Sequence, residues 1–137
     1  MGRQFVIQME NRPGELAHLA RALGARGIDI SHVASIWAGT CASMFMTTTD
    51  AAATRDVLRG LGHEFMEGDL ITVDVEDRPG GLADVTERLA RAGVNIVGAM
   101  TVGRRPGWME MTFAVDDEPK AREALGMVAS EPVIAGA

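Results

Sequence analysis

Stretches in which apolar and polar residues alternate recur along the chain, and they predict β-strands with one buried face. The clearest run from Gln4 to Met9, over Ser43–Thr49, from Ile71 to Val75 and over Trp108–Val115. Other apolar residues recur at the spacing of amphipathic helices. They are Leu16, Leu19, Ala20 and Leu23 in one segment, and Leu82, Val85 and Leu89 in another. The pattern therefore predicts an α+β protein.

Part of this pattern occurs twice, at a constant separation of 66 positions. The matched residues are Arg12/Arg78, Pro13/Pro79, Leu16/Leu82, Leu23/Leu89, Gly27/Gly93 and Ile30/Ile96. Arg-Pro-Gly ends the strand in each copy, because proline fixes φ and lacks an N–H while glycine permits a sharp turn. Gly27 and Gly93 stand where a left-handed cap would end each helix. An offset kept over about twenty positions indicates a duplicated unit.

The other segments complete both copies in the order βαββαβ. In the first copy we predict strands at Ile28–Ile36, Ser43–Thr49 and His63–Glu67, and a helix from Ala51 to Leu61 capped by Asp50. In the second we predict strands at Val94–Val102, Trp108–Val115 and Val133–Ile134, and a helix from about Glu118 to Leu125 opened by Asp116. Gly68-Asp69 is the whole linker, so domains at residues 1–67 and 69–137 are expected to pack as one body.

Composition limits the compartment and the partners. The net charge of −6 and the aromatic content of 4% disfavour nucleic acid, which needs basic charge and stacking aromatics. Cys41 has no second cysteine to pair with, and His18, His32 and His63 are too scattered for a metal site. No apolar run approaches membrane-spanning length, and the first strand begins too early for a signal peptide. We expect a soluble cytoplasmic protein without membrane contact, metal or cofactor.

The repeated residues resemble a known family. Glu10-Asn11-Arg12-Pro13-Gly14-Glu15-Leu16, followed by Gly27-Ile28-Asp29-Ile30, resembles the opening of an ACT domain. Glu76-Asp77-Arg78-Pro79-Gly80-Gly81-Leu82, followed by Gly93-Val94-Asn95-Ile96, resembles it again. The resemblance covers nearly the whole chain and is weakest at its C-terminus. It implies two ferredoxin-like βαββαβ units packed side by side, forming an eight-stranded antiparallel sheet with helices on one face.

The resemblance also implies that amino acids bind in clefts between units, through the first strand–helix turn and the start of the second strand. In the first copy the implied ligand-binding residues are Asn11, Arg12, Pro13, Gly14, Glu15, Leu16, Asp29 and Ile30. In the second they are Asp77, Arg78, Pro79, Gly80, Gly81, Leu82, Asn95 and Ile96. Most ACT domains regulate an attached enzyme or DNA-binding domain. This chain shows no such attachment, so we expect a free-standing tandem protein with an unidentified regulated partner.

The residue types suit a zwitterion. The helix start after Pro13-Gly14 offers unpaired N–H groups and a positive dipole end to a carboxylate. Asn11 offers a donor and an acceptor, and Asp29 can accept hydrogen bonds from an ammonium. Asp77 would repel a carboxylate, so we favour the Asn11/Asp29 site or a cleft that draws on both copies. The alternative is that Asx residues before Pro-Gly only make turns.

A patch of methionines suggests an interface. If Phe45 and Thr47 face the helices, as Met111 and Phe113 do one repeat later, the opposite, open face of the sheet is apolar. Its predicted interface residues are Val6, Met44 and Met46. Apolar patches on open faces mark interfaces, so we expect a homodimer or a higher homo-oligomer. The alternative is a shifted register, with the methionines in the core.

These features favour a non-catalytic regulatory protein that binds a small ligand, a free amino acid, whose binding favours one arrangement of units or subunits. The alternative is a ligand-independent interaction module that oligomerises through strand edges and the open sheet face. An enzyme is disfavoured, because no nucleophile–base pair, metal cluster or phosphate loop is apparent, and no catalytic residue is predicted.

Overall fold

The computed structural model describes residues 2–127, which form six strands and four helices. The strands are β1 (Arg3–Glu10), β2 (Ile30–Ala38), β3 (Cys41–Thr48), β4 (Phe65–Glu76), β5 (Ile96–Arg105) and β6 (Trp108–Val115). The helices are α1 (Glu15–Ala25), α2 (Ala51–Leu61), α3 (Gly81–Arg91) and α4 (Glu118–Ala124). None of these four helices has the length and apolar character needed to cross a membrane.

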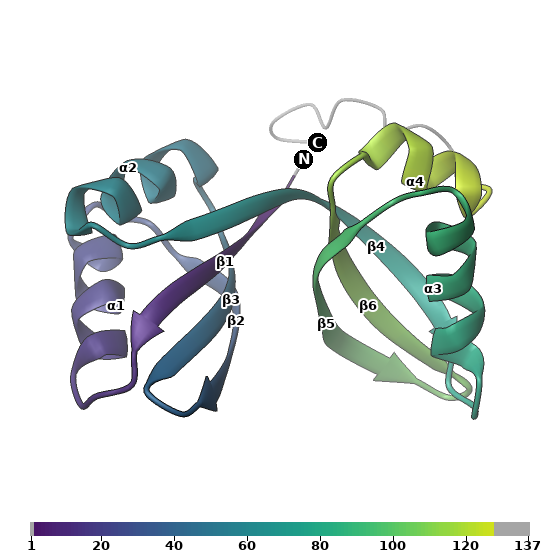
Figure 1. The fold of residues 1–137 in the computed structure, drawn as a ribbon, viewed down its shortest axis with the longest axis horizontal. Coiled ribbons are helices and arrows are strands. Elements are labelled where there is room, and N and C mark those ends of the chain that lie inside the picture. Colours follow the sequence, from purple (N-terminus) through teal and green to yellow (C-terminus); the bar gives the residue numbers. More distant parts are fainter. Residues whose placement is uncertain (1, 128–137) are drawn as a thin grey trace. The chain divides into compact units, whose positions relative to one another are not determined.

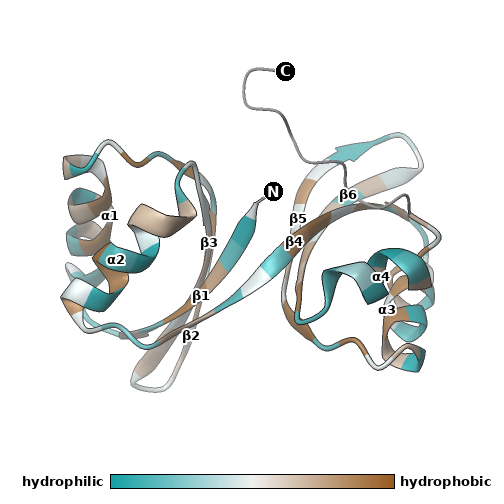
Figure 2. Ribbon diagram, turned by 90° about the horizontal axis from the view of Figure 1, so that it is seen from above, coloured by the Kyte–Doolittle hydropathy of each residue, from teal (hydrophilic) through white to brown (hydrophobic). Residues whose placement is uncertain are grey.

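The elements separate into two compact units, one over Gly2–Glu67 and one that begins at Gly68. In each unit two helices lie on one side of the strands (Figure 1). The helices carry both hydrophobic and hydrophilic segments (Figure 2), as expected when one helix face packs on a sheet. Each unit accordingly has a hydrophobic core of its own.

The two cores are built by the same strand pairings. In the N-terminal unit, β3 pairs antiparallel with β1 on one side and with β2 on the other. In the C-terminal unit, β6 pairs in the same way with β4 and β5. Phe5, Leu19 and Leu58 are fully buried in the first core, and Phe113 and Leu89 in the second. The alternating strand pattern and the helical leucines of the sequence therefore meet in these two cores.

The predicted eight-stranded sheet is wrong, because the described residues form one six-stranded sheet in the order β2-β3-β1-β4-β6-β5. The predicted strand at His63–Glu67, the Gly68-Asp69 linker and the strand that follows are replaced largely by one continuous strand, β4. A Cβ on Gly68 would lie 3.1 Å from both the Ala114 Cβ and the Val115 carbonyl oxygen. Gly68 thus permits close strand contact and is not part of a turn. The predicted strand at Val133–Ile134 lies outside the described residues.

The prediction that Met44 and Met46 lie on the open sheet face is also wrong. Met44 is 3% exposed and Met46 is 0% exposed, and both belong to the N-terminal core. Phe45 and Thr47 therefore point to the opposite side of β3 from the helices. Val6, the third predicted interface residue, is half-buried and pairs with Phe45. The shifted-register alternative is the one that holds for the methionines.

One extra residue in the second copy explains this error. β5 has a register shift between Thr101 and Gly103 that β2 lacks. Ser35 pairs with Met44, whereas Thr101, 66 positions after Ser35, pairs with Met111, 67 positions after Met44. Beyond the bulge the copies correspond at an offset larger by one, and a one-residue slip moves every side chain to the other face. Met44 is thus the counterpart of the core residue Met111.

The same extra residue moves the helix cap of the second copy. The Asp50 side chain accepts a hydrogen bond from the Ala53 N–H at 3.0 Å and caps α2. In the second copy it is Asp117, not the predicted Asp116, that caps α4 by accepting from the Lys120 N–H at 3.1 Å. Asp116 instead accepts from the Asn95 N–H at 2.9 Å.

Candidate ligand-binding site

The two strand–helix turns place an open helix start after each Pro-Gly pair. Gly14 and Gly80 have φ values of 91° and 85°, which glycine adopts without strain, and they stand at the N-cap positions of α1 and α3. Glycine has no side chain that could accept a hydrogen bond, so neither of these helices has a side-chain cap. Asp50 and Asp117 cap the other two helices. First-turn N–H groups without a cap suit an anionic ligand group.

In the first turn, Asn11 is held mainly by its backbone. Its N–H donates to the Thr40 carbonyl oxygen at 3.0 Å, while its side-chain Nδ2 is 3.5 Å from the Gly39 carbonyl oxygen, at the limit of a hydrogen bond. The Asn11 side chain is exposed and adjoins the hairpin between β2 and β3. Its amide is thus available to a ligand at little cost in existing bonds.

Arg12, by contrast, is engaged with two carboxylates. Its Nε donates to Glu15 at 2.5 Å, and its Nη1 lies 3.0 Å from a Glu10 oxygen. The hydrogen bond to Glu15 and the charges of Glu10 and Glu15 raise the pKa of the Arg12 guanidinium above its ordinary value. Two carboxylates around one guanidinium give these three side chains a net negative charge. They therefore favour a ligand ammonium as a further hydrogen-bonding partner.

A groove of about 170 Å³ adjoins this turn and the end of β2. It is lined by Met9, Glu10, Asn11, Arg12, Glu15, Leu16, Ser35, Ile36, Trp37, Ala42 and Met44. Leu16 is 47% exposed and Trp37 is 63% exposed, so both present apolar surface at its mouth. A volume of this size corresponds to about six water molecules. The groove therefore suits a small metabolite and is below the range typical of drug-sized ligands.

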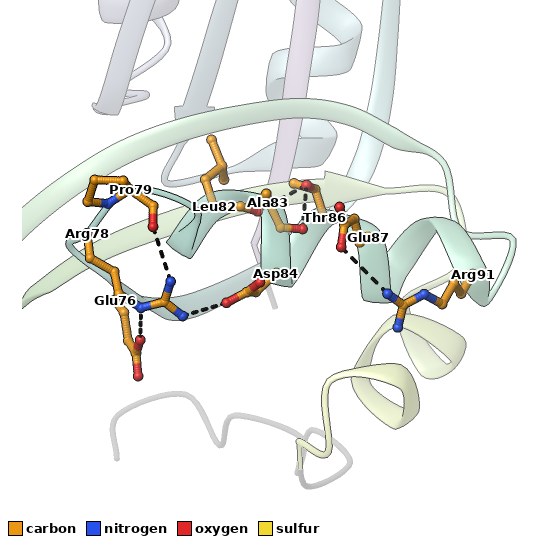
Figure 3. Close-up of polar contacts among 9 residues, drawn as sticks. All are labelled: Glu76, Arg78, Pro79, Leu82, Ala83, Asp84, Thr86, Glu87 and Arg91. Atoms are coloured by element: carbon orange, nitrogen blue, oxygen red, sulfur yellow. Dashed lines mark hydrogen bonds and ion pairs between the residues drawn. The ribbon is translucent and has the colours of Figure 1, made fainter.

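The arginine of the second turn is held by ion pairs (Figure 3), as Arg12 is in the first turn. The Arg78 guanidinium donates to the Glu76 carboxylate, to the Pro79 carbonyl oxygen at 3.1 Å and to Asp84 at 2.5 Å. These bonds, that to Glu76 first and that to Asp84 second, raise the pKa of Arg78 above its ordinary value. Arg78 therefore has its hydrogen-bonding capacity largely satisfied within the turn.

Asp77, the second-copy counterpart of Asn11, is also engaged. The Arg104 Nη1 donates to Asp77 Oδ2 at 2.9 Å, and the Asp77 N–H donates to the Gly107 carbonyl oxygen at 3.0 Å. A separate cavity of about 250 Å³ lies beside this turn, lined by Asp74, Glu76, Arg78, Gly81, Asp84, Val85, Arg88 and Trp108. Asp77 does not line that cavity.

The structure does not bring Asn11 and Asp29 together within the N-terminal unit. The Asp29 N–H donates to Thr49 Oγ1 at 3.0 Å, beside the start of β2, where Ile30 pairs with Thr48. Asn11 adjoins the hairpin at the far end of the same strand. The length of β2 therefore separates the two side chains. The C-terminal unit repeats this separation, with Asp77 beside Gly107 and Asn95 beside Asp116.

Seven lining residues were not foreseen as ligand-binding from the sequence, namely Met9, Glu10, Ser35, Ile36, Trp37, Ala42 and Met44. The predicted strand ended at Ile36, and only the strand pairing shows that β2 continues to Ala38 beside the Asn11 turn. Adjacent apolar residues in an otherwise alternating strand were the available signal, since Ile36 and Trp37 point to opposite faces and are 62% and 63% exposed.

Strand β2, at one edge of the sheet, has no charged residue. Residues 30–38 contain no Asp, Glu, Lys or Arg, and Val33, Ile36 and Trp37 are all exposed. β5, at the other end of the described sheet, has two register shifts and ends in Arg104 and Arg105. Charges and bulges protect strand edges from pairing with other chains. β5 is thus protected by charges as well as by bulges, whereas β2 has one register shift, between Ile30 and His32, and no charged residue.

Comparisons with known proteins match the ACT resemblance over part of the chain. The ACT domain family model matches residues 70–126. A search of the curated proteins finds no match. That residues 1–67 form a second ACT domain stays a prediction.

Solved structures share the fold over most of the chain. A protein from Bacteroides thetaiotaomicron is similar with a TM-score of 0.67 at 19% identity, over 90% of this chain and 85% of that one. The regulatory subunit of aspartate kinase from Thermus flavus is similar with a TM-score of 0.66 at 20% identity, over 91% of this chain and 90% of that one. The ligand-free form of that subunit from Thermus thermophilus has a TM-score of 0.60 at 18% identity, over 91% and 90%.

Proposed function

We propose that this chain is a non-catalytic regulatory protein that binds a free amino acid beside the turn between β1 and α1. The observation that carries the proposal is the groove at this turn, where the weakly bonded Asn11 side chain adjoins the uncapped start of α1. The match of residues 70–126 to the ACT domain family supports a regulatory role, as does the fold shared with aspartate kinase regulatory subunits.

The polar end of the groove offers complementary partners to both ends of an amino acid. The α1 start suits the ligand carboxylate. Glu10 and Glu15, which share one guanidinium, suit the ammonium, and Asn11 can donate to one group and accept from the other. Binding would regulate by favouring whichever arrangement of units or subunits forms the better site.

Asp29 and Ile30 would join this site only from another copy of the chain, because β2 separates them from Asn11. Antiparallel pairing of two β2 strands centred on Ser35 would set Val33 opposite Trp37 of the second copy. The same pairing would carry Asp29 of the second copy toward the sheet end that holds Asn11. A shared site of this kind would make ligand binding and assembly depend on each other.

Calorimetric titration of protein freed from bound ligand, against each of the twenty common amino acids, tests the proposal. Heat of binding is expected with at least one of them, and Asn11→Ala is expected to weaken it. His18→Ala, on the exposed part of α1 and outside the groove, is the control and should bind as the wild type does. No heat with any amino acid would overturn the proposed function.

The uncharged edge strand β2 supports a second candidate function, a ligand-independent interaction module that assembles through strand pairing. Unpaired N–H and C=O groups along an uncharged strand can accept a further strand. In that case Asn11→Ala would leave function intact, whereas a lysine in β2 would abolish assembly. A regulated partner protein would then be selected by the assembled surface and not by a ligand.

A further inference from the structure

We infer that only the first of the two strand–helix turns binds a ligand, and that it takes one amino acid with an apolar side chain per chain. This inference rests on the proposed function and adds to it the number of sites and the class of ligand. It follows from a comparison of the two copies position by position, using strand pairing and not the sequence offset alone.

The pairing identifies which residues stand at the same place in the two copies. Trp37 pairs with Ala42 in the first copy, and Arg104 pairs with Met109 in the second. Because of the extra residue in β5, Arg104 and not Gly103 is the counterpart of Trp37. Met109 is likewise the counterpart of Ala42, and Asp77 that of Asn11.

In the second copy these positions close the groove. Arg104 reaches across to Asp77 and forms an ion pair at 2.9 Å. Met109 replaces the small Ala42, packs against the C-terminal core, and receives a contact from Thr101 Oγ1 to its sulfur at 3.7 Å. An ion pair and a longer side chain thus occupy the positions that Asn11, Trp37 and Ala42 leave open in the first copy.

In the first copy the same positions line an open groove. The Asn11 side-chain Nδ2 is 3.5 Å from the Gly39 carbonyl oxygen, and Trp37 is 63% exposed. Ala42, where the second copy has methionine, leaves space between them. A groove of about 170 Å³ is consequently present where the second copy has the Asp77–Arg104 ion pair.

The lining of the open groove indicates the ligand class. Its polar residues lie on the turn, whereas its strand wall is formed by Ile36, Trp37, Ala42 and Met44 with only Ser35 polar. Leu16 completes the apolar side. A ligand with its ammonium and carboxylate at the turn would place its side chain against this wall. A charged side chain would lose its hydration there without gaining a partner, so apolar side chains are favoured.

Two linked measurements test the inference. Calorimetry with the twenty amino acids should give heat for aliphatic or aromatic ones, a stoichiometry of one per chain, and binding about tenfold or more weaker for Asp, Glu, Lys and Arg. Because Trp37 and Trp108 are the chain's two tryptophans, ligand contact with Trp37 should also shift the intrinsic fluorescence. The shift should persist in Trp108→Phe and vanish in Trp37→Phe.

A matched pair of double variants separates site closure from general damage. Asn11→Asp with Trp37→Arg gives the first groove the residues that close the second, and it should abolish binding while the circular dichroism spectrum is retained. Asp77→Asn with Arg104→Trp makes the mirror exchange in the second copy, where Met109 still fills the space. This variant should keep the wild-type affinity and a stoichiometry of one.

The outcomes distinguish this inference from the function on which it rests. No heat with any amino acid would overturn both. Heat with a stoichiometry of two, preference for a charged side chain, or wild-type binding by the folded Asn11→Asp/Trp37→Arg variant would overturn the inference alone. The expected set of results supports a single apolar site per chain.

Discussion

At the scale of single residues, the two turns differ at the position that directly follows the Pro-Gly pair. The first copy has Glu15 there and the second has Gly81, which is buried. A Cβ built on Gly81 would lie 2.0 Å from the Glu76 carbonyl oxygen, far inside van der Waals contact. Only the first of the two turns therefore has room for a side chain at this position.

Gly81→Ala is expected to lower the free energy of unfolding of the C-terminal unit by about 3 kcal/mol, because the Glu76 backbone must move to admit the methyl group. Urea unfolding followed by circular dichroism measures the change.

The matched control is Gly24→Ala in α1, where a Cβ would meet nothing within 4 Å. Alanine in a helix is favoured over glycine, so this variant should be more stable by about 0.5–1 kcal/mol. Equal effects at both positions would contradict the close approach at Gly81.

At the scale of elements, an ion cluster at Glu67 joins the start of β4 to β1 and α2 within the N-terminal unit. The Arg55 guanidinium of α2 donates to both Glu67 oxygens, at 2.9 Å each in its two shortest contacts, and Arg3 of β1 lies 3.2 Å away. The hydrogen bonds from Arg55, together with the charge of Arg3, hold the pKa of Glu67 below its ordinary value despite partial burial. The cluster joins β1, α2 and β4.

This lowered pKa predicts an acid-dependent loss of stability. The folded pKa lies below the unfolded value of about 4.3, so the stabilisation is fully present above that pH and is lost as pH falls through the folded pKa. Glu67→Gln should cost about 1 kcal/mol at pH 7, and less at pH 3.

Urea unfolding of both proteins at the two pH values measures the difference. The control is Glu87→Gln, whose ion pair with Arg91 is 3.5 Å long and well exposed, and which should change stability little at either pH. A Glu67→Gln effect that is the same at pH 3 and pH 7 would argue against the ion cluster as its cause.

Some features of the helices and strands could be predicted from neighbouring residues in the sequence, and others could not. The alternation in β1 and the capping by Asp50 are local features, and both appear in the structure as predicted. The facing of β3 follows from its pairing with β1 and β2, and a comparison of the two copies at a constant offset of 66 misses the extra residue in β5. Gly68-Asp69, predicted as the linker, lies instead within β4, where Asp69 pairs with Val115 of β6.

At the scale of the whole molecule, the charge distribution indicates where two copies can meet. Each chain has a net charge of −6, so copies repel at most surfaces. β2 has no fully charged residue and exposes Val33, Ile36 and Trp37, whereas β5 ends in two arginines. Pairing of two β2 strands centred on Ser35 would match Val33 with Trp37, and Ala34 with Ile36, so that the apolar residues cover each other.

Val33→Lys is therefore expected to convert a dimer of the chain into a monomer in sedimentation velocity experiments, because an inward charge on an edge strand blocks pairing. Val33 is 48% exposed, so the substitution should leave the fold intact. Ala99→Lys is the matched control, since Ala99 pairs with Phe113 as Val33 pairs with Met46. A wild-type monomer, or a dimer that survives Val33→Lys, would contradict pairing through β2.

The sequence by itself determined the two Pro-Gly turns, the helices and most strands, because periodicity, glycine and proline act within a few residues of the chain. It also pointed to Asn11, whose turn adjoins the open groove. Only the tertiary structure decided that β4 is continuous, that Met44 and Met46 are core residues, and that Asn11 and Asp29 stand at opposite ends of β2. It likewise decided that Asp77 forms an ion pair with Arg104 at 2.9 Å, while the Asn11 side chain has a 3.5 Å contact with Gly39. These facts depend on strand register and on contacts between distant residues, and a single bulge is enough to change them.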